Sequence, residues 1–181
     1  EELKYILEPY VVDGGGTIIF APPGRTKTWW GLLIAVAANN GIALFDGSCA
    51  ETPTLFVNLE RSDKSLKRRI AAVNRLLKTG AHNLYVLNVR GRALRDVIPS
   101  IERFVAKHEV GLIVLDSISR AGYGKLVDDQ SVNAMMDDLN RLSRSWVALA
   151  HTPRPSGDKE ADHVFGSMMF DAAADILVQL V

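Results

Sequence analysis

Lys27 and Thr28 are the residues of this chain whose types and spacing best suit chemistry on a bound ligand. They follow a Pro-Gly loop and precede an apolar helical run, while the apolar residues 17–20 before the loop predict a buried strand. A loop between strand and helix can hold phosphate on its backbone N–H groups, with a lysine reaching the β and γ oxygens and a hydroxyl binding Mg²⁺. We therefore predict a nucleotide phosphate site here.

The loop departs from the full pattern G-x-x-x-x-G-K-S/T at both outer glycines. Ala21 stands at the first glycine position and Thr26 at the second. A β-branched residue allows fewer backbone conformations than glycine does, so we expect Thr26 to lower nucleotide affinity or turnover.

Three further polar residues, Glu60, Asp116 and His151, each directly follow a predicted strand. The carboxyl ends of parallel strands lie at one edge of a sheet, so these side chains should gather there. Asp116 is placed to hold magnesium, Glu60 to act as general base towards water, and His151 to contact a γ-phosphate. Each also has a structural alternative: a turn aspartate, a surface glutamate near a helix start, and a histidine that only supports the strand end.

The elements that must position these residues alternate between strand and helix along the chain. Strands are predicted over 17–20, 54–59, 84–87, 111–115, 146–150 and 175–181, and helices over 29–39, 62–80, 93–107, 132–142 and 166–174. Ser62 is expected to cap the second helix, and Pro99 to kink the third or begin a new one. This alternation predicts an α/β fold of three layers, α/β/α, with a mostly parallel central sheet.

Composition indicates an ordinary globular chain. Of 181 residues, 48% are hydrophobic, and 21 Lys and Arg balance 21 Asp and Glu, so a global basic excess for nucleic-acid binding is absent. Cys49 is the single cysteine, which excludes an intramolecular disulfide, and no apolar run has membrane length. We expect a cytoplasmic protein, in the host cytoplasm if of phage origin, without a membrane partner.

The domain division places a lead-in at residues 1–16 and a core at 17–181. The lead-in ends in three glycines and is interpreted as a simple linker. The chain stops within an apolar run, so we expect that the core is truncated at its C-terminal end.

The order and spacing of five segments resemble the RecA-like P-loop ATPases, in particular RepA-type hexameric replicative helicases and related phage and plasmid ATPases, with DnaB-type helicases more distant. The segments are APPGRTKT, LFVNLE followed by RS, GLIVLDSISR, LAHT and GSMMFDAAADILVQL. The resemblance runs from the glycine triplet to the end of the chain.

This resemblance implies ATP and Mg²⁺ as cofactors. Lys27, Glu60, Asp116 and His151 match the family's catalytic positions, and Thr28 and Asp116 match its magnesium-binding positions. The nucleotide would be held by Pro23, Gly24, Arg25, Thr26, Lys27, Thr28 and Trp29.

In the family, the loops after the Walker B strand and after the sensor strand contact single-stranded DNA inside a hexameric ring or a filament. The corresponding basic residues here are Arg120, Lys125, Arg154 and Lys159. Ordinary polar loops remain an equal alternative for these two segments. The family's arginine finger has three possible counterparts, Arg61, Arg120 and Arg154, between which the sequence does not decide.

The resemblance implies an ATP-hydrolysing motor domain for DNA replication or recombination, a helicase or a DNA-dependent ATPase acting as a homo-oligomer. An alternative is a nucleotide-binding switch or assembly module with weak or no hydrolysis, which Thr26 favours. A small-molecule kinase is a third, although residues 153–163 poorly match the arginine-rich lid of such enzymes.

Overall fold

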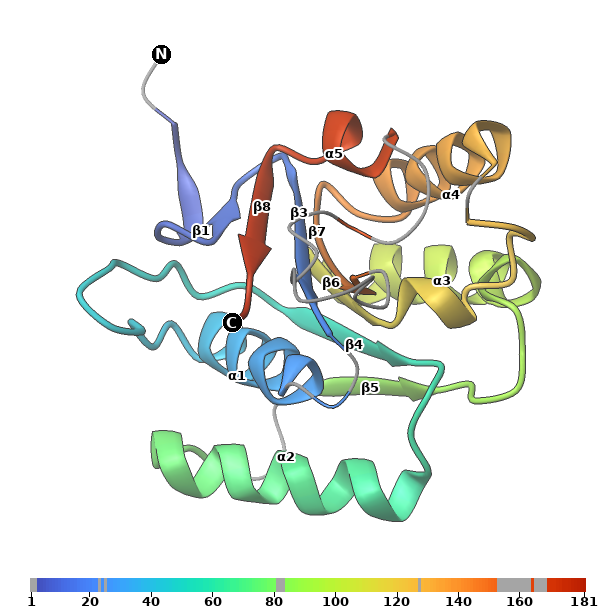
Figure 1. Cartoon of the computed structure of the whole chain (residues 1–181). Coiled ribbons are helices and arrows are strands. Elements are labelled where there is room, and N and C mark those ends of the chain that lie inside the picture. Colours follow the sequence, from blue (N-terminus) through green and yellow to red (C-terminus); the bar gives the residue numbers. More distant parts are fainter. Residues whose placement is uncertain are drawn as a thin grey trace.

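The computed structural model describes residues 3–22, 24, 26–80, 84–126, 128–152, 164 and 169–181. A six-stranded sheet forms its middle layer, in the order β5-β4-β6-β7-β3-β8, and every pairing in it is parallel (Figure 1). The strands are β3 (Gly16–Ala21), β4 (Thr54–Asn58), β5 (Tyr85–Asn88), β6 (Leu112–Asp116), β7 (Ser145–His151) and β8 (Ile176–Gln179).

Helices cover both faces of the sheet, which confirms the predicted three-layer α/β fold. The helices α1 (Lys27–Asn39) and α2 (Asp63–Leu77) lie on one face. The other face carries α3 (Leu94–His108), α4 (Asp129–Leu142) and α5 (Met169–Ala173), with the short 3₁₀ turn η1 (Ile118–Arg120) after β6.

The four inner strands are the most buried part of the molecule. In β3, β4 and β6 every residue is buried, as the continuously apolar sequences predict for parallel strands covered on both faces. The outermost strands β5 and β8 instead alternate between half-buried and exposed residues. Trp146 of β7 lies against Gly16 of β3, where an added Cβ would stand 2.1 Å from the indole ring.

The segment before the first sheet strand is not a linker, and that prediction is wrong for residues 3–16. It forms an antiparallel hairpin of β1 (Tyr5–Leu7) and β2 (Val11–Val12). Leu7 and Val11 are both 0% exposed and join the core on the α1 side of the sheet. The Thr17 hydroxyl also donates a hydrogen bond of 2.7 Å to the Tyr10 carbonyl, which ties the hairpin to β3.

Helix boundaries differ from the predictions in three places. Helix α1 begins at Lys27, so Lys27 and Thr28 belong to its first turn. Helix α2 has the predicted Ser62 cap but ends at Leu77, because Lys78 adopts a left-handed conformation with φ 55°. Helix α3 runs as one element through Pro99, whereas a kink or a new helix start was predicted.

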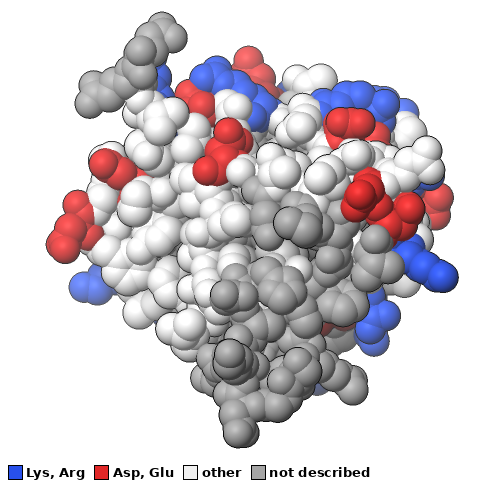
Figure 2. All heavy atoms as spheres, turned by 45° about the horizontal axis from the view of Figure 1, so that its top comes forward, with Lys and Arg blue, Asp and Glu red and all other residues white. Residues whose placement is uncertain are grey.

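Charged residues of both signs are mixed over the described surface. On the face turned forward in Figure 2, acidic and basic side chains lie close together around the rim, in keeping with the equal numbers of each in the chain. Among the described helices, none is long and apolar enough to cross a membrane.

Candidate nucleotide site

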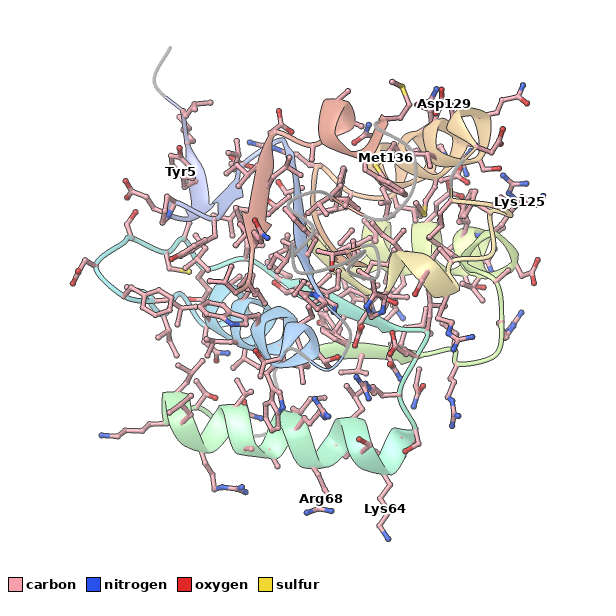
Figure 3. All side chains as sticks on the ribbon, viewed as in Figure 1. Tyr5, Lys64, Arg68, Lys125, Asp129 and Met136 are labelled. Carbon is pink, nitrogen blue, oxygen red and sulfur yellow. The ribbon has the colours of Figure 1, made fainter. Side chains whose placement is uncertain are left out.

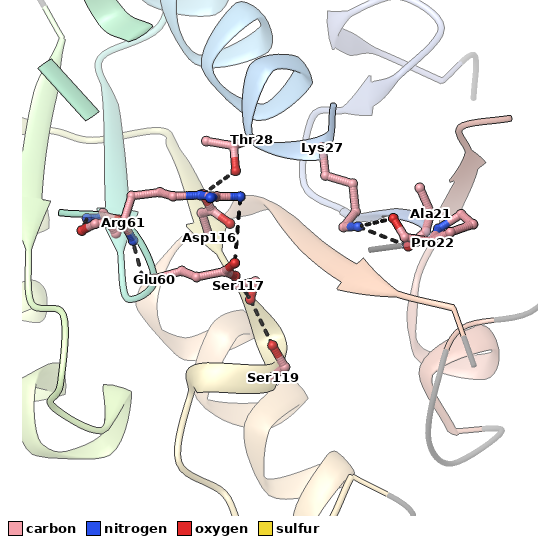
Figure 4. Close-up of polar contacts among 10 residues, drawn as sticks. Ala21, Pro22, Lys27, Thr28, Glu60, Arg61, Asp116, Ser117 and Ser119 are labelled. Atoms are coloured by element: carbon pink, nitrogen blue, oxygen red, sulfur yellow. Dashed lines mark hydrogen bonds and ion pairs between the residues drawn. The ribbon is translucent and has the colours of Figure 1, made fainter. Parts of the chain in front are cut away.

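The phosphate loop ends where α1 begins, so the lysine and hydroxyl predicted to bind the ligand lie at a helix N-terminus. The first N–H groups of a helix have no partner within it and favour an anion. The Lys27 Nζ donates to the carbonyl oxygens of Ala21 and Pro22, both at 2.9 Å (Figure 4). Burial lowers the pKa of Lys27, while the carboxylates of Glu60 and Asp116 oppose that shift.

Asp116 and Thr28 meet at the bottom of the site. Asp116 ends β6 between β4 and β7, and its Oδ2 accepts a hydrogen bond of 2.9 Å from the Thr28 hydroxyl (Figure 4). Asp116 is 2% exposed, and this burial raises its pKa to about 6 even though the Thr28 hydrogen bond acts in the opposite direction. The pair offers two oxygen ligands of the type that magnesium prefers.

Glu60 is held by contacts that start at Asn58, the last residue of β4. The Asn58 side-chain oxygen accepts from the backbone N–H groups of Glu60, at 3.3 Å, and Arg61, at 2.9 Å. The Glu60 carboxylate in turn accepts a 2.8 Å hydrogen bond from the Ser117 hydroxyl and lies 3.7 Å from the Arg61 guanidinium. Asn58 and Ser117 therefore position the carboxylate that was predicted to act on water.

His151 ends β7 opposite Ala21 of β3, so it faces the start of the phosphate loop. Burial is the main cause that lowers its pKa, followed by the charge of Lys27, and both favour a neutral ring. Its Nδ1 is buried and finds no hydrogen-bond partner within the described part of the chain. A ligand oxygen or a water can supply that missing partner.

These residues surround one hollow, the nucleotide pocket, with a volume of about 210 Å³. It is lined by Gly24, Thr26, Lys27, Thr28, Trp29, Glu60, Arg61, Arg69, Asp116 and His151. All four predicted catalytic residues are thus brought together, as are Gly24, Thr26, Thr28 and Trp29 of the predicted nucleotide-binding set. Pro23 and Arg25 lie outside the described residues.

Two arginines in the nucleotide pocket were not predicted to bind the nucleotide. Arg69, expected to be part of a solvated helix surface, has its guanidinium carbon 4.9 Å from the centroid of the Trp29 ring. Arg61 was considered only as an arginine finger, yet its Nε is buried in the same pocket without a partner among the described residues. Their spacing of eight residues, counted from the residue before the Ser62 cap, is the signal that would have placed both on one side.

A larger hollow of about 650 Å³ continues from the nucleotide pocket along α2. Trp29 and Arg69 line both hollows, and the larger one also contains Lys64, Arg68 and Arg75. Lys64 and Arg68 extend from α2 away from the sheet (Figure 3). The nucleotide pocket therefore opens onto a basic surface with an aromatic ring at the junction.

Of the four residues predicted to contact DNA, Arg120 and Lys125 lie within the described chain. Arg120 ends η1 and is exposed beside Glu60, and Lys125 is exposed on the loop towards α4 (Figure 3). Arg154 and Lys159 lie outside the described residues.

The nucleotide pocket fits a magnesium-bound nucleoside triphosphate. It has an ammonium and a helix N-terminus for phosphate, a hydroxyl and a carboxylate for the metal, and an orphaned imidazole nitrogen. Among the described residues, no group of three or more His, Cys, Asp or Glu side chains can hold a metal ion. Magnesium would therefore also need oxygens from the nucleotide and from water.

The parallel sheet and this pocket at the carboxyl ends of its strands define a RecA-like P-loop ATPase domain. The family model described as the AAA domain matches residues 1–151, and the chain belongs to this family. The sequence-based resemblance to RecA-like P-loop ATPases is thereby confirmed at the level of class.

Among solved structures, the chain is similar to the ATPase domain of a helicase, with a TM-score of 0.67 and 15% sequence identity. The match covers 93% of this chain and 70% of the other. At that identity the likeness shows the fold alone. Comparison with curated proteins found no match to this sequence.

Proposed function

We propose that this domain binds ATP with Mg²⁺ and hydrolyses it as a motor domain in DNA replication or recombination. The observation that carries the proposal is the convergence of Lys27, Thr28, Glu60, Asp116 and His151 on one pocket at the sheet edge. These residues provide phosphate neutralisation, metal ligands and a base, which are the parts that phosphoryl transfer to water requires.

In the proposed mechanism, bound Mg²⁺ supplies charge neutralisation to the phosphate oxygens. Thr28 and Asp116 would hold the metal, and the Lys27 ammonium would exchange its loop carbonyls for phosphate oxygens. Glu60, held by Ser117, would orient the attacking water and accept its proton. Neutral His151 would offer its unpartnered Nδ1 side to the terminal phosphate.

The nucleotide base and sugar need more room than the 210 Å³ pocket provides. The hollow along α2 supports a place for them, because it shares Trp29 and Arg69 with the nucleotide pocket. An aromatic ring and a guanidinium plane both offer flat surfaces for a base.

The DNA-linked part of the proposal rests on the family resemblance and on the position of Arg120 directly after β6, beside Glu60. We propose single-stranded DNA as the macromolecular ligand and a ring or filament of identical subunits as the assembly. Contacts to phosphates by a few loop cations would bind in a salt-dependent and largely sequence-independent way.

The test is ATP turnover by the wild type and Lys27→Ala, with and without single-stranded DNA at low salt. We expect magnesium-dependent turnover that the substitution abolishes and that DNA raises in the wild type. Unchanged turnover in Lys27→Ala would exclude this pocket as the site. A flat rate on DNA titration would remove the DNA-dependent role but leave the ATPase proposal in place.

A switch with little hydrolysis is a second candidate, because Thr26 replaces glycine in the loop and the unliganded Lys27 is already held by that loop. Tight nucleotide binding with negligible turnover would favour this function. An increase in turnover on Thr26→Gly would then identify Thr26 as the residue that slows the reaction.

A further inference from the structure

A second hollow, the arginine pocket, lies beside the nucleotide pocket at the same edge of the sheet. It has a volume of about 390 Å³, and its lining includes Arg90, Arg92, Arg120 and Glu60. Three guanidinium groups thus face a single carboxylate, and the lining carries a net positive charge. An anionic ligand is the partner that such a lining selects.

The three arginines are available to a ligand. All three are exposed, and within the described part of the chain none of them has an ion pair. The carboxylate of Glu60 already accepts from Ser117 at 2.8 Å, so it does not neutralise the group.

Backbone contacts hold the arginines close together although they come from two loops. The Arg92 N–H donates to the Val89 carbonyl at 3.0 Å, which closes the turn after β5. The Leu94 N–H donates at 2.9 Å to the carbonyl of Ala121, the residue directly after Arg120. The arginine pocket is therefore built by the fold rather than by chance proximity of long side chains.

The chemistry of the lining favours phosphate. A guanidinium group presents a planar fork of N–H donors that matches phosphate oxygens, and it keeps its charge at any physiological pH. The hollow is larger than one phosphate group needs, and its exposed arginines allow a chain to pass through it. We propose that the arginine pocket binds the phosphodiester backbone of single-stranded nucleic acid, an inference that rests on the proposed function.

The position of Glu60 gives this binding a consequence for ATP turnover. Glu60 lines both the nucleotide pocket and the arginine pocket, so one side chain faces the reacting phosphates and the bound strand. A phosphodiester beside the arginines changes the charge around the residue that handles the attacking water. By linkage, nucleotide and strand then affect each other's binding.

The test compares Arg90→Ala/Arg92→Ala with Arg103→Ala/Lys107→Ala, a control that removes the same charge from the exposed surface of α3. Binding of fluorescent oligothymidylate is measured across a salt titration. We expect the first variant to lose about tenfold or more in affinity at low salt and to reduce the logarithmic salt slope by about 1.4. The control should bind as the wild type does.

The second readout is the ratio of DNA-stimulated to basal ATP turnover. It should fall to near unity in Arg90→Ala/Arg92→Ala and recover in Arg90→Lys/Arg92→Lys, which keeps the charges and checks for misfolding. Wild-type affinity and stimulation in the alanine variant would overturn the inference while leaving the proposed function intact.

Other outcomes identify a different occupant and equally overturn the inference. A variant that loses only inhibition by inorganic phosphate would show a site for free phosphate. A variant that loses only self-association in sedimentation would show a subunit contact. A wild type that binds no oligothymidylate would remove both this inference and the DNA part of the proposed function.

Discussion

Asp116 combines two properties that oppose each other in the absence of a ligand. It is placed to hold a metal as an anion, yet its side chain is buried and its pKa is raised to about 6. For a carboxyl, a native pKa above the unfolded value means that ionisation destabilises the fold. The stabilising effect is complete below about pH 3.8 and is lost as pH rises through about 6.

We therefore predict that Asp116→Asn stabilises the metal-free protein at about pH 8, by up to about 3 kcal/mol. The amide oxygen can still accept from Thr28, while the buried charge is removed. Thermal unfolding in EDTA should show this gain shrinking as the pH falls towards about 4. The same variant should lose stabilisation by Mg²⁺ and ATP. Equal melting temperatures at high pH would show that Asp116 is not strained by burial.

At the scale of elements, the contact between the turn before α3 and the segment after η1 holds the two arginine loops together. Gly122 has φ +81°, and a Cβ added there would stand 2.5 Å from the Ala93 Cβ. Both the backbone conformation and the close approach therefore require glycine.

We predict that Gly122→Ala destabilises the fold by roughly 2–4 kcal/mol in urea unfolding, because strain and steric overlap add. Gly91→Ala is the matched control for strain alone, since Gly91 has φ +86° with no atom within 4 Å of an added Cβ. Gly80→Ala has neither constraint and should change little. Equal effects of Gly122→Ala and Gly91→Ala would argue against tight packing of this contact.

Periodicity and strand-end residues were enough to predict the layers and to place Glu60, Asp116 and His151 at one edge. The sequence did not predict that Asn58 and Ser117 hold Glu60, because side-chain hydrogen bonds of this kind leave no periodic signal. The hairpin formed by β1 and β2 was also missed, since its strands of three and two residues are too short for alternation to be recognised.

For the molecule as a whole, we predict nucleotide-dependent self-association of the wild type in sedimentation velocity. Trp29, which is 37% exposed, and the unpartnered Arg61 Nε both lie at the nucleotide pocket, where a second subunit would cover them. Lys27→Ala serves as the control, because it should not respond to ATP with Mg²⁺. A wild type that stays monomeric at all concentrations would remove the ring or filament from the proposal.

The two hydrogen bonds from Lys27 to its own loop give the empty site an internal competitor for the ligand. A nucleotide must replace both carbonyl acceptors before it gains from the ammonium, so part of the interaction is an exchange rather than a net addition. A triphosphate can complete that exchange with its outer oxygens, whereas a monophosphate does not extend to them. The lysine thereby discriminates between charged and spent forms of the same nucleotide before any reaction takes place.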